Sequence, residues 1–158
     1  MVPARTLVRP MTDTADRPTT LRLPAAERRR QLLDVALHAF AEHGYHDTSM
    51  NDVAVAAGVT KPVLYQHFAS KKALYQELVD HLGNGLEQAI VAAVAPADGP
   101  RHQVEAGFRA YFRWAINQGE AFRVLFADRN RTDRELAAAV SKVESMVADR
   151  VASLILVD

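Results

Sequence analysis

The segment Gly44–Leu74, GYHDTSMNDVAVAAGVTKPVLYQHFASKKAL, decides the fold of this chain. Ala54 is small where two helices have to cross closely, and Gly58 can adopt the positive φ that ends a helix. Leu64 is then placed to pack the following helix back onto the first. These three spacings are typical of a helix-turn-helix, in which a tight turn joins two helices.

Short polar residues mark where the two helices begin. Ser49 with Asp52 three residues later approximates a capping box, so the first helix is predicted to begin at position 48 or 49 and to end at Gly58. The second helix is predicted to follow Thr60, a hydroxyl N-cap. Pro62 lies in its first turn, where a missing N–H costs nothing.

Helical periodicity extends on both sides of this segment. We predict a helix at about 26–43 before it, ended by Gly44. A long helix at about 71–94 follows it, capped by Ser70 and carrying a continuous apolar stripe.

The remainder of the chain also has a helical pattern. After a loop at 95–100 we predict an amphipathic helix interrupted by Gly119, then a short apolar helix around 122–126. A capping box of Thr132 and Glu135 opens a last long helix. No convincing alternation of apolar and polar residues occurs, so the predicted fold is all-α.

Charge is unevenly distributed along the chain. Its 158 residues are 49% hydrophobic and 24% charged, which suits a packed core. The formal net charge is zero, but positions 1–75 carry ten Lys and Arg against seven Asp and Glu, and positions 76–158 carry nine against twelve. A basic front and an acidic back suit a protein whose front meets phosphate.

Composition also bears on compartment. The chain has no cysteine, which excludes disulfide and thiolate chemistry, and no apolar run of the roughly 20 residues that a membrane span needs. It lacks the apolar block of a secretory signal, so we expect a cytoplasmic protein. Residues 1–24 mix Pro, Thr, Arg and Asp without periodicity and are predicted to be a disordered tail.

The helix that follows Thr60 has an inward and an outward face. Val59, Leu64 and Phe68 are spaced to point inward. The outer or N-terminal positions are Lys61, Pro62, Val63, Gln66 and His67. A helix held in this way fits the major groove of B-DNA, where a lysine can donate to guanine and apolar groups can contact a thymine methyl. The Tyr65 hydroxyl has the reach for a phosphate.

Two lysines begin the long helix at 71–94. Lys71 and Lys72 lie in its first turn, where the helix dipole disfavours cations by about 0.3–1 kcal/mol each. A phosphate docked at that helix end would reverse the penalty, and the hydroxyls of Thr48 and Ser49 suit the same role at their own helix start. We therefore expect phosphate contacts at both helix starts.

The segment from about Arg28 to Leu82 resembles the DNA-binding domain of TetR-family transcriptional regulators. The residues that carry the resemblance are Ala36, Phe40, Gly44, Tyr45, Thr48, Ser49, Val53, Ala54, Ala57, Gly58, Val59, Leu64, Tyr65, His67, Phe68, Lys71 and Leu74. The resemblance implies a homodimer, most often a repressor, that places two recognition helices in successive major grooves of a palindromic operator. It also implies that a small-molecule effector, bound in the C-terminal domain, changes the spacing of those helices.

Site residues follow from the resemblance by position. The DNA-facing residues would be Thr48, Ser49, Met50, Thr60, Lys61, Pro62, Val63, Tyr65, His67 and Lys71. No cofactor and no metal is implied. One departure is Lys72, where the family often has an acidic residue.

The resemblance also implies a division of the chain. Residues 25–86 would form the helix-turn-helix DNA-binding domain, and residues 87–158 part of an effector-binding and dimerisation domain. The family continues with two further helices that build a four-helix dimer bundle, whereas this sequence stops at LILVD within an apolar run. We expect that run either to continue in a longer protein or to be covered by a second subunit.

Aromatic residues gather in the C-terminal half and are predicted to line a ligand pocket there. They are Phe108, Tyr111, Phe112, Trp114, Phe122 and Phe126. As a hypothesis, Tyr111 and Trp114 contribute to an apolar effector site, with Arg109 or Arg113 available to an anionic ligand. Ordinary core packing is the alternative for an aromatic stripe at helical spacing.

Two other classes of protein are alternatives to a DNA-binding regulator. A metal-dependent enzyme would need histidines that converge, but His38 and His43 are five residues apart on different helix faces, and His46 lies beyond Gly44. We therefore expect no enzyme. A helical module that binds protein in place of DNA is the other alternative, and it would lack salt-dependent affinity for DNA.

Overall fold

The computed structural model describes residues 23–127 and 133–155 of the chain. Its helices are α1 (Ala25–Asp47), α2 (Met50–Ala56), α3 (Lys61–His67), α4 (Lys71–Val94), α5 (Gly99–Asn117), α6 (Gly119–Phe122) and α7 (Arg134–Ile155). A π-helical segment, η1 (Arg123–Ala127), follows α6. No strand occurs among these described residues, and the all-α prediction is confirmed.

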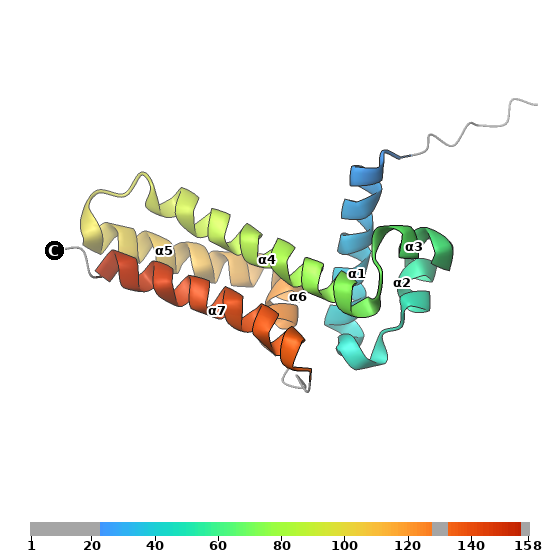
Figure 1. Ribbon diagram of the computed structural model, residues 1–158. Coiled ribbons are helices and arrows are strands. Elements are labelled where there is room, and N and C mark those ends of the chain that lie inside the picture. Colours follow the sequence, from blue (N-terminus) through green and yellow to red (C-terminus); the bar gives the residue numbers. More distant parts are fainter. Residues whose placement is uncertain (1–22, 128–132, 156–158) are drawn as a thin grey trace, which may run out of the picture.

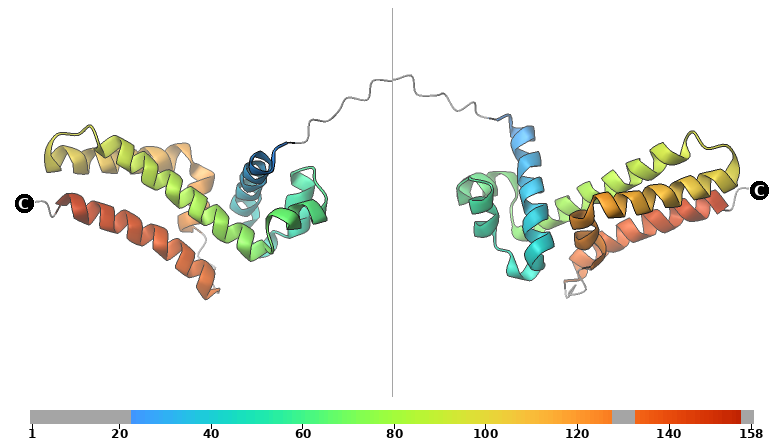
Figure 2. Two further views of the ribbon diagram at one scale, coloured as in Figure 1. Left: turned by 45° about the horizontal axis from the view of Figure 1, so that its top comes forward. Right: turned by 180° about the vertical axis from the view of Figure 1, so that it is seen from behind.

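The helices form two groups that share α4. α1, α2 and α3 gather at one end of the molecule (Figures 1 and 2). α5 runs beside the C-terminal part of α4, and α7 follows α4 from its first turn, where Lys72 meets Glu135, to Glu87, which meets Arg150. α6 and η1 contact α1 and so close the space between the groups. The boundary expected at residues 86 and 87 falls inside α4, which is continuous there.

One face of α4 forms the centre of the core. Leu74, Leu78, Leu82, Leu86 and Ile90, the apolar stripe expected from the sequence, are all buried. The stripe recurs every four residues, so it stays on one side of the helix and can meet both groups in turn.

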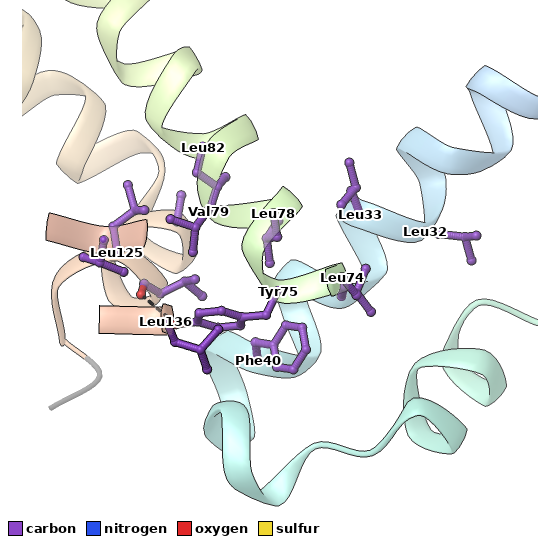
Figure 3. Packing of buried hydrophobic residues seen from close by; sticks show 14 of the residues in the cluster. Leu32, Leu33, Phe40, Leu74, Tyr75, Leu78, Val79, Leu82, Leu125 and Leu136 are labelled. Carbon is purple, nitrogen blue, oxygen red and sulfur yellow. Dashed lines mark hydrogen bonds between the residues drawn. The ribbon is translucent and has the colours of Figure 1, made fainter. Parts of the chain in front are cut away.

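Tyr75 joins three elements near the start of α4 (Figure 3). Its ring meets the ring of Phe40 on α1 edge-on, with centroids 5.1 Å apart. Its hydroxyl donates a hydrogen bond to the carbonyl oxygen of Val124 in η1, at 3.3 Å. The contact satisfies a buried hydroxyl and ties α1, α4 and η1 into one core.

Small residues set how closely α4 and α7 approach. A Cβ atom added at Gly83 would lie 2.6 Å from Cγ2 of Val143 on α7. A Cβ at Gly85, on the same helix, would meet nothing within 4 Å. Gly83 therefore serves the packing of α7, and Gly85 does not.

Several predicted boundaries differ from the structure. α1 breaks at Gly44, whose φ is +79°, but helical structure resumes as far as Asp47. α5 begins at Gly99, inside the predicted loop at 95–100. The predicted helix at 122–126 is divided between α6 and η1.

Two predictions fall wholly or partly on residues that the structure does not describe. Thr132 of the predicted capping box lies outside the described residues, as do residues 1–22 of the predicted tail. The carboxylate of Asp133 accepts hydrogen bonds from the N–H groups of Glu135, at 2.9 Å, and Leu136, at 3.4 Å. Asp133 thus caps the start of α7.

Candidate DNA interface

The turn between α2 and α3 has the geometry that the sequence predicts. Gly58 has a φ of +66°. Its N–H donates to the carbonyl of Val55 at 3.1 Å, and the N–H of Val59 donates to that of Ala54 at 3.0 Å. These two bonds are those of a Schellman motif, which ends a helix at a glycine in the left-handed region.

Apolar contacts hold α3 against the rest of this group. Leu64 is completely buried, and Phe68, the residue after α3, is 2% exposed. Val53 and Ala54 on α2 are buried to a similar degree. Since α3 has one buried row, its remaining positions are turned toward solvent.

The outer face of α3 contains the residues expected to meet DNA. Lys61, Pro62 and Tyr65 are exposed, and Val63 and His67 are half-buried. Thr60 precedes the helix at its N-cap position and is exposed, but its side chain makes no capping hydrogen bond. Figures 1 and 2 show α3 at the end of the molecule, away from α5 and α7. The face is therefore open to a large ligand.

Ser49 at the start of α2 is engaged in hydrogen bonds with Asp52. The capping box is present: the Ser49 hydroxyl accepts from the N–H of Asp52 at 3.1 Å, and the N–H of Ser49 donates to the Asp52 carboxylate at 2.8 Å. The Ser49 hydroxyl also donates to that carboxylate, at 2.6 Å. These hydrogen bonds from Ser49 lower the pKa of Asp52 below its ordinary value. Ser49 remains exposed, so its hydroxyl lies at the surface.

Two residues expected to face DNA do not do so. Thr48 is 1% exposed, and its hydroxyl donates to the carbonyl oxygens of Gly44 at 2.7 Å and Ala39 at 3.2 Å. Met50 is 6% exposed and belongs to the apolar core. The hydroxyl of Thr48 satisfies carbonyls at the end of α1, and Met50 points into the helix group, so the prediction is wrong for both side chains.

The lysines at the start of α4 bind protein groups. The ammonium of Lys71 donates to the carbonyl of Tyr45 at 2.7 Å and lies 4.4 Å from the centre of the Tyr45 ring. Lys72 contacts Asp133 at 3.2 Å and Glu135 at 2.6 Å. The hydrogen bond to Glu135 raises the pKa of Lys72. Both ammonium groups have partners within the chain, and the phosphate role expected of the two lysines stays a prediction.

Sequence reasoning missed Arg29, which lies on α1 behind the recognition helix. Its guanidinium contacts both carboxylate oxygens of Glu77 on α4 and the carbonyl oxygen of His67 at the end of α3. It also lies 4.4 Å from the centre of the Phe68 ring. No local pattern could have indicated these contacts, because the partners are 38 and 48 residues away.

An apolar cavity of about 130 Å³ lies between α4, α5 and α7. Its lining consists of Ile90, Val104, Gly107, Phe108, Tyr111, Val147, Arg150 and Val151. Arg150, the charged member, contacts Glu87 at 3.2 Å. The cavity is concave and largely apolar, as small-molecule sites are.

The six predicted pocket aromatics do not converge on this cavity. Phe108 and Tyr111 line it. Phe112 is 58% exposed, and Trp114 lines a separate hollow with Ala89 and Ala93. Phe122 and Phe126 pack on each other, with ring centroids 5.0 Å apart. Four of the six lie on α5, which presents them to different sides, and Phe122 and Phe126 lie on α6 and η1.

The arginines predicted to meet an anionic ligand are also placed elsewhere. Arg109 pairs with Glu105 at 2.8 Å on the exposed side of α5. Arg113 lines the hollow that contains Trp114. Neither lines the apolar cavity, where the charged residue is Arg150.

The histidines expected to lack a converging geometry make other contacts. His38 lies 2.8 Å from a carboxylate oxygen of Glu120 on α6 and 3.5 Å from one of Glu42. Within residues 23–127 and 133–155, no group of three or more His, Cys, Asp or Glu side chains is arranged to hold a metal ion. In that same part of the chain, none of the helices is both long and apolar enough to cross a membrane.

Comparisons with known proteins agree with the helix-turn-helix geometry. Residues 32–78 match the family model described as bacterial regulatory proteins, tetR family. The HTH-type transcriptional activator FasR of Mycolicibacterium smegmatis is 38% identical over 138 residues, a match that covers 85% of this chain and 61% of FasR. The transcriptional repressor KstR2 of Mycobacterium tuberculosis is 35% identical over 105 residues, covering 64% of this chain and 50% of KstR2. The chain therefore spans less than two thirds of these relatives.

Solved structures show the same fold over most of the chain. A TetR-like transcriptional regulator from Rhodococcus sp. RHA1 superimposes with a TM-score of 0.71 at 31% sequence identity. That match covers 84% of this chain and 72% of the Rhodococcus protein. The helix-turn-helix and the helices that follow it thus share both sequence and arrangement with a known regulator, and the chain belongs to the TetR family of bacterial regulatory proteins.

Proposed function

We propose that this chain is a DNA-binding transcriptional regulator that acts in the cytoplasm by binding and not by catalysis. It places α3 in the major groove of its operator. The observation that carries the proposal is the position of α3: Leu64 and Phe68 anchor it from behind, while Lys61, Pro62 and Tyr65 face solvent. A helix supported in this way can enter the groove without moving away from its own core.

The residues of this interface have separate roles. Lys61 reads a base edge, Pro62 and Val63 meet thymine methyl groups, and Tyr65 donates to a phosphate. Thr60 and His67 border the helix at its two ends, and Ser49 faces DNA at the start of α2 with its hydroxyl proton held by Asp52. The exposure of Lys61, Tyr65 and Ser49 supports these roles. A bidentate lysine contact to guanine is worth about 1–3 kcal/mol of discrimination.

The binding unit is a homodimer on a palindromic operator. Two copies of α3 would then lie in major grooves about one helical turn, roughly 34 Å, apart. Family membership supports this arrangement. The division into a DNA-binding domain at 25–86 and an effector and dimerisation domain at 87–158 belongs to the same proposal, with α4 as the helix common to both.

An apolar small molecule in the α4–α5–α7 cavity is the proposed effector. Phe108 and Tyr111 would contact it. The charge of Arg150 is balanced by Glu87, which supports a ligand that is apolar where it meets this lining. A thermal-shift panel of small aliphatic and aromatic compounds tests the site. Val147→Phe, which fills the cavity, should remove any stabilisation while leaving DNA binding intact.

Repression is the proposed mode of action, by occupation of the promoter. The relatives include both a named repressor, KstR2, and a named activator, FasR. A reporter placed behind the operator separates the two modes. Deletion of the regulator should raise reporter output if it represses, and an activator would give the opposite result.

Selection of bound duplexes from a random DNA pool tests the function as a whole. We expect a consensus with two-fold symmetry, whose binding weakens steeply as salt is raised. A protein that only binds other proteins would enrich no sequence. That result would favour the alternative of a helical interaction module.

A further inference from the structure

Arg29 brings together three groups: a carboxylate on α4, the last carbonyl of α3 and the ring of the residue that follows α3. Its Nε lies 2.6 Å from Oε1 of Glu77, and a second N–H donates to the other carboxylate oxygen. A third N–H donates to the carbonyl of His67, while the guanidinium plane lies over the ring of Phe68. The planar fork of arginine suits this simultaneous binding of carboxylate, carbonyl and ring, which a lysine cannot reproduce.

The end of α3 needs such a partner. α3 has seven residues and is too short to be stable by itself. Its last carbonyl groups have no partner within the helix, and a cation at that end is favoured by the helix dipole. Buried Leu64 and Phe68 attach α3 along one line, and Arg29 adds a polar contact at the last residue, His67. That third point restricts rotation of α3 about its apolar contacts.

The same guanidinium connects α3 to α4, the helix that runs from the helix-turn-helix group to the cavity. Glu77 lies on α4, and α4 continues to Ile90, which lines the apolar cavity. The angle of α3 relative to α4 is therefore set partly through Arg29. A shift of α4 would reach the end of the recognition helix by this contact.

We propose that Arg29 is a positioning residue for operator reading: by joining the end of α3 to Glu77 on α4, it holds the outward face of α3 at the angle at which base edges are read. This inference rests on the proposed function. It assigns Arg29 no contact with DNA, although the residue is basic and its side chain is 39% exposed.

The test uses the full chain and two variants that weaken the same contact from opposite sides. Arg29→Lys keeps the charge but loses the fork, and Glu77→Gln keeps the shape of the partner but loses its charge. Arg30→Lys is the matched control, since Arg30 is the exposed neighbour on α1. Affinity is measured for a duplex recovered from the random pool and for a scrambled duplex of equal length, over a range of salt, together with the thermal midpoint.

We expect both variants to lose roughly tenfold in affinity for the selected duplex, the loss of a hydrogen-bonded ion pair. Affinity for the scrambled duplex and the slope of log affinity against log salt should stay unchanged, as should all binding by Arg30→Lys. This pattern would mean that the variants distinguish the selected duplex from the scrambled one less well, while every phosphate contact is kept.

Other outcomes overturn the inference in distinguishable ways. Equal losses on both duplexes with a shallower salt slope in Arg29→Lys would make Arg29 a phosphate contact. Equal losses that follow a lowered thermal midpoint would make the contact purely stabilising. Unchanged discrimination in both variants would remove the role altogether. If the wild-type chain enriches no sequence, the proposed function fails first and the positioning role fails with it.

Discussion

The two ends of the molecule are held together by different kinds of contact. Around α3, polar groups of neighbouring helices bind the backbone at helix ends: Arg29 binds the carbonyl of His67, Lys71 that of Tyr45, and Thr48 that of Gly44. Around the cavity, α4, α5 and α7 meet mainly through apolar side chains and leave an open volume of about 130 Å³. The first arrangement fixes the directions of the helices, and the second leaves the space that the proposed effector would occupy.

Polar side-chain contacts connect these two ends. Lys72 at the start of α4 binds Asp133 and Glu135 at the start of α7, and His38 on α1 meets Glu120 on α6. The desolvation of Tyr45 and the nearby charge of Asp133 raise the pKa of the Tyr45 hydroxyl. A change around the cavity therefore has short physical routes to α1 and α4.

The largest expected difference between the two ends concerns packing. Leu64→Ala removes a completely buried side chain beneath α3 and should lower the free energy of unfolding by about 2–5 kcal/mol. Phe112→Ala on α5 removes a side chain that is 58% exposed and should change it by about 0.5 kcal/mol or less. Urea unfolding followed by circular dichroism measures both. Similar losses of unfolding free energy in the two variants would contradict the packing described for Leu64 and Phe112.

Base reading should depend on the exposed face of α3 alone. Lys61→Ala should lower discrimination at one base pair of each half-site by about 1–3 kcal/mol. The ammonium of Lys71 binds the carbonyl of Tyr45, so Lys71→Ala should leave the sequence preference unchanged and lower the thermal midpoint. Binding to a set of single-base variants of the selected duplex measures the preference. A lost preference in Lys71→Ala alone would reverse the assignment.

Two glycines of α4 sharpen the account of the cavity end. Gly83→Ala should lower the free energy of unfolding by about 1–2 kcal/mol, because its Cβ would meet Val143 on α7. Gly85→Ala has open space and should raise it by about 0.5–1 kcal/mol through helix propensity. Thermal unfolding of both variants checks the prediction, and stabilisation by both would mean that α7 does not approach Gly83 so closely.

The smallest expected effect is the contribution of Asp52 to stability at low pH. Because hydrogen bonds from Ser49 lower the pKa of Asp52, its contribution to stability is present above the unfolded-state pKa of about 4 and is lost as the pH falls through the lower folded-state value. Asp52→Asn should therefore flatten the loss of stability as the pH falls below about 4. Urea midpoints across that range measure it, and equal slopes in the wild type and the variant would contradict the assignment.

Local chemistry explains which parts could be predicted from the sequence. The capping box of Ser49 and Asp52, the turn at Gly58 and the stripe of α4 each depend on residues within a few positions of one another, and all three are present. The structural neighbours of Lys72 and Arg29 are tens of residues away in sequence, so no local pattern indicates them. Lys72, expected to contact a phosphate, binds Asp133. Arg29, which no sequence pattern singles out, binds the last carbonyl of α3.

The errors near the site have physical reasons of their own. A hydroxyl at a helix start can bind phosphate, which is why the sequence predicts a DNA contact for Thr48, but its hydroxyl donates to the carbonyl of Gly44. The aromatics of α5 and the residues after it share helical spacing, and spacing alone does not tell a cavity lining such as Tyr111 from an exposed position such as Phe112.

The central claim is that α3 reads bases in the major groove, and guanine N7 methylation interference on the selected duplex tests it most directly. The account predicts interference at two clusters of guanines about one helical turn apart, with the interference at one base pair of each cluster lost in Lys61→Ala. Binding that tolerates methylation of every major-groove guanine, and whose pattern Lys61→Ala leaves unchanged, would contradict it.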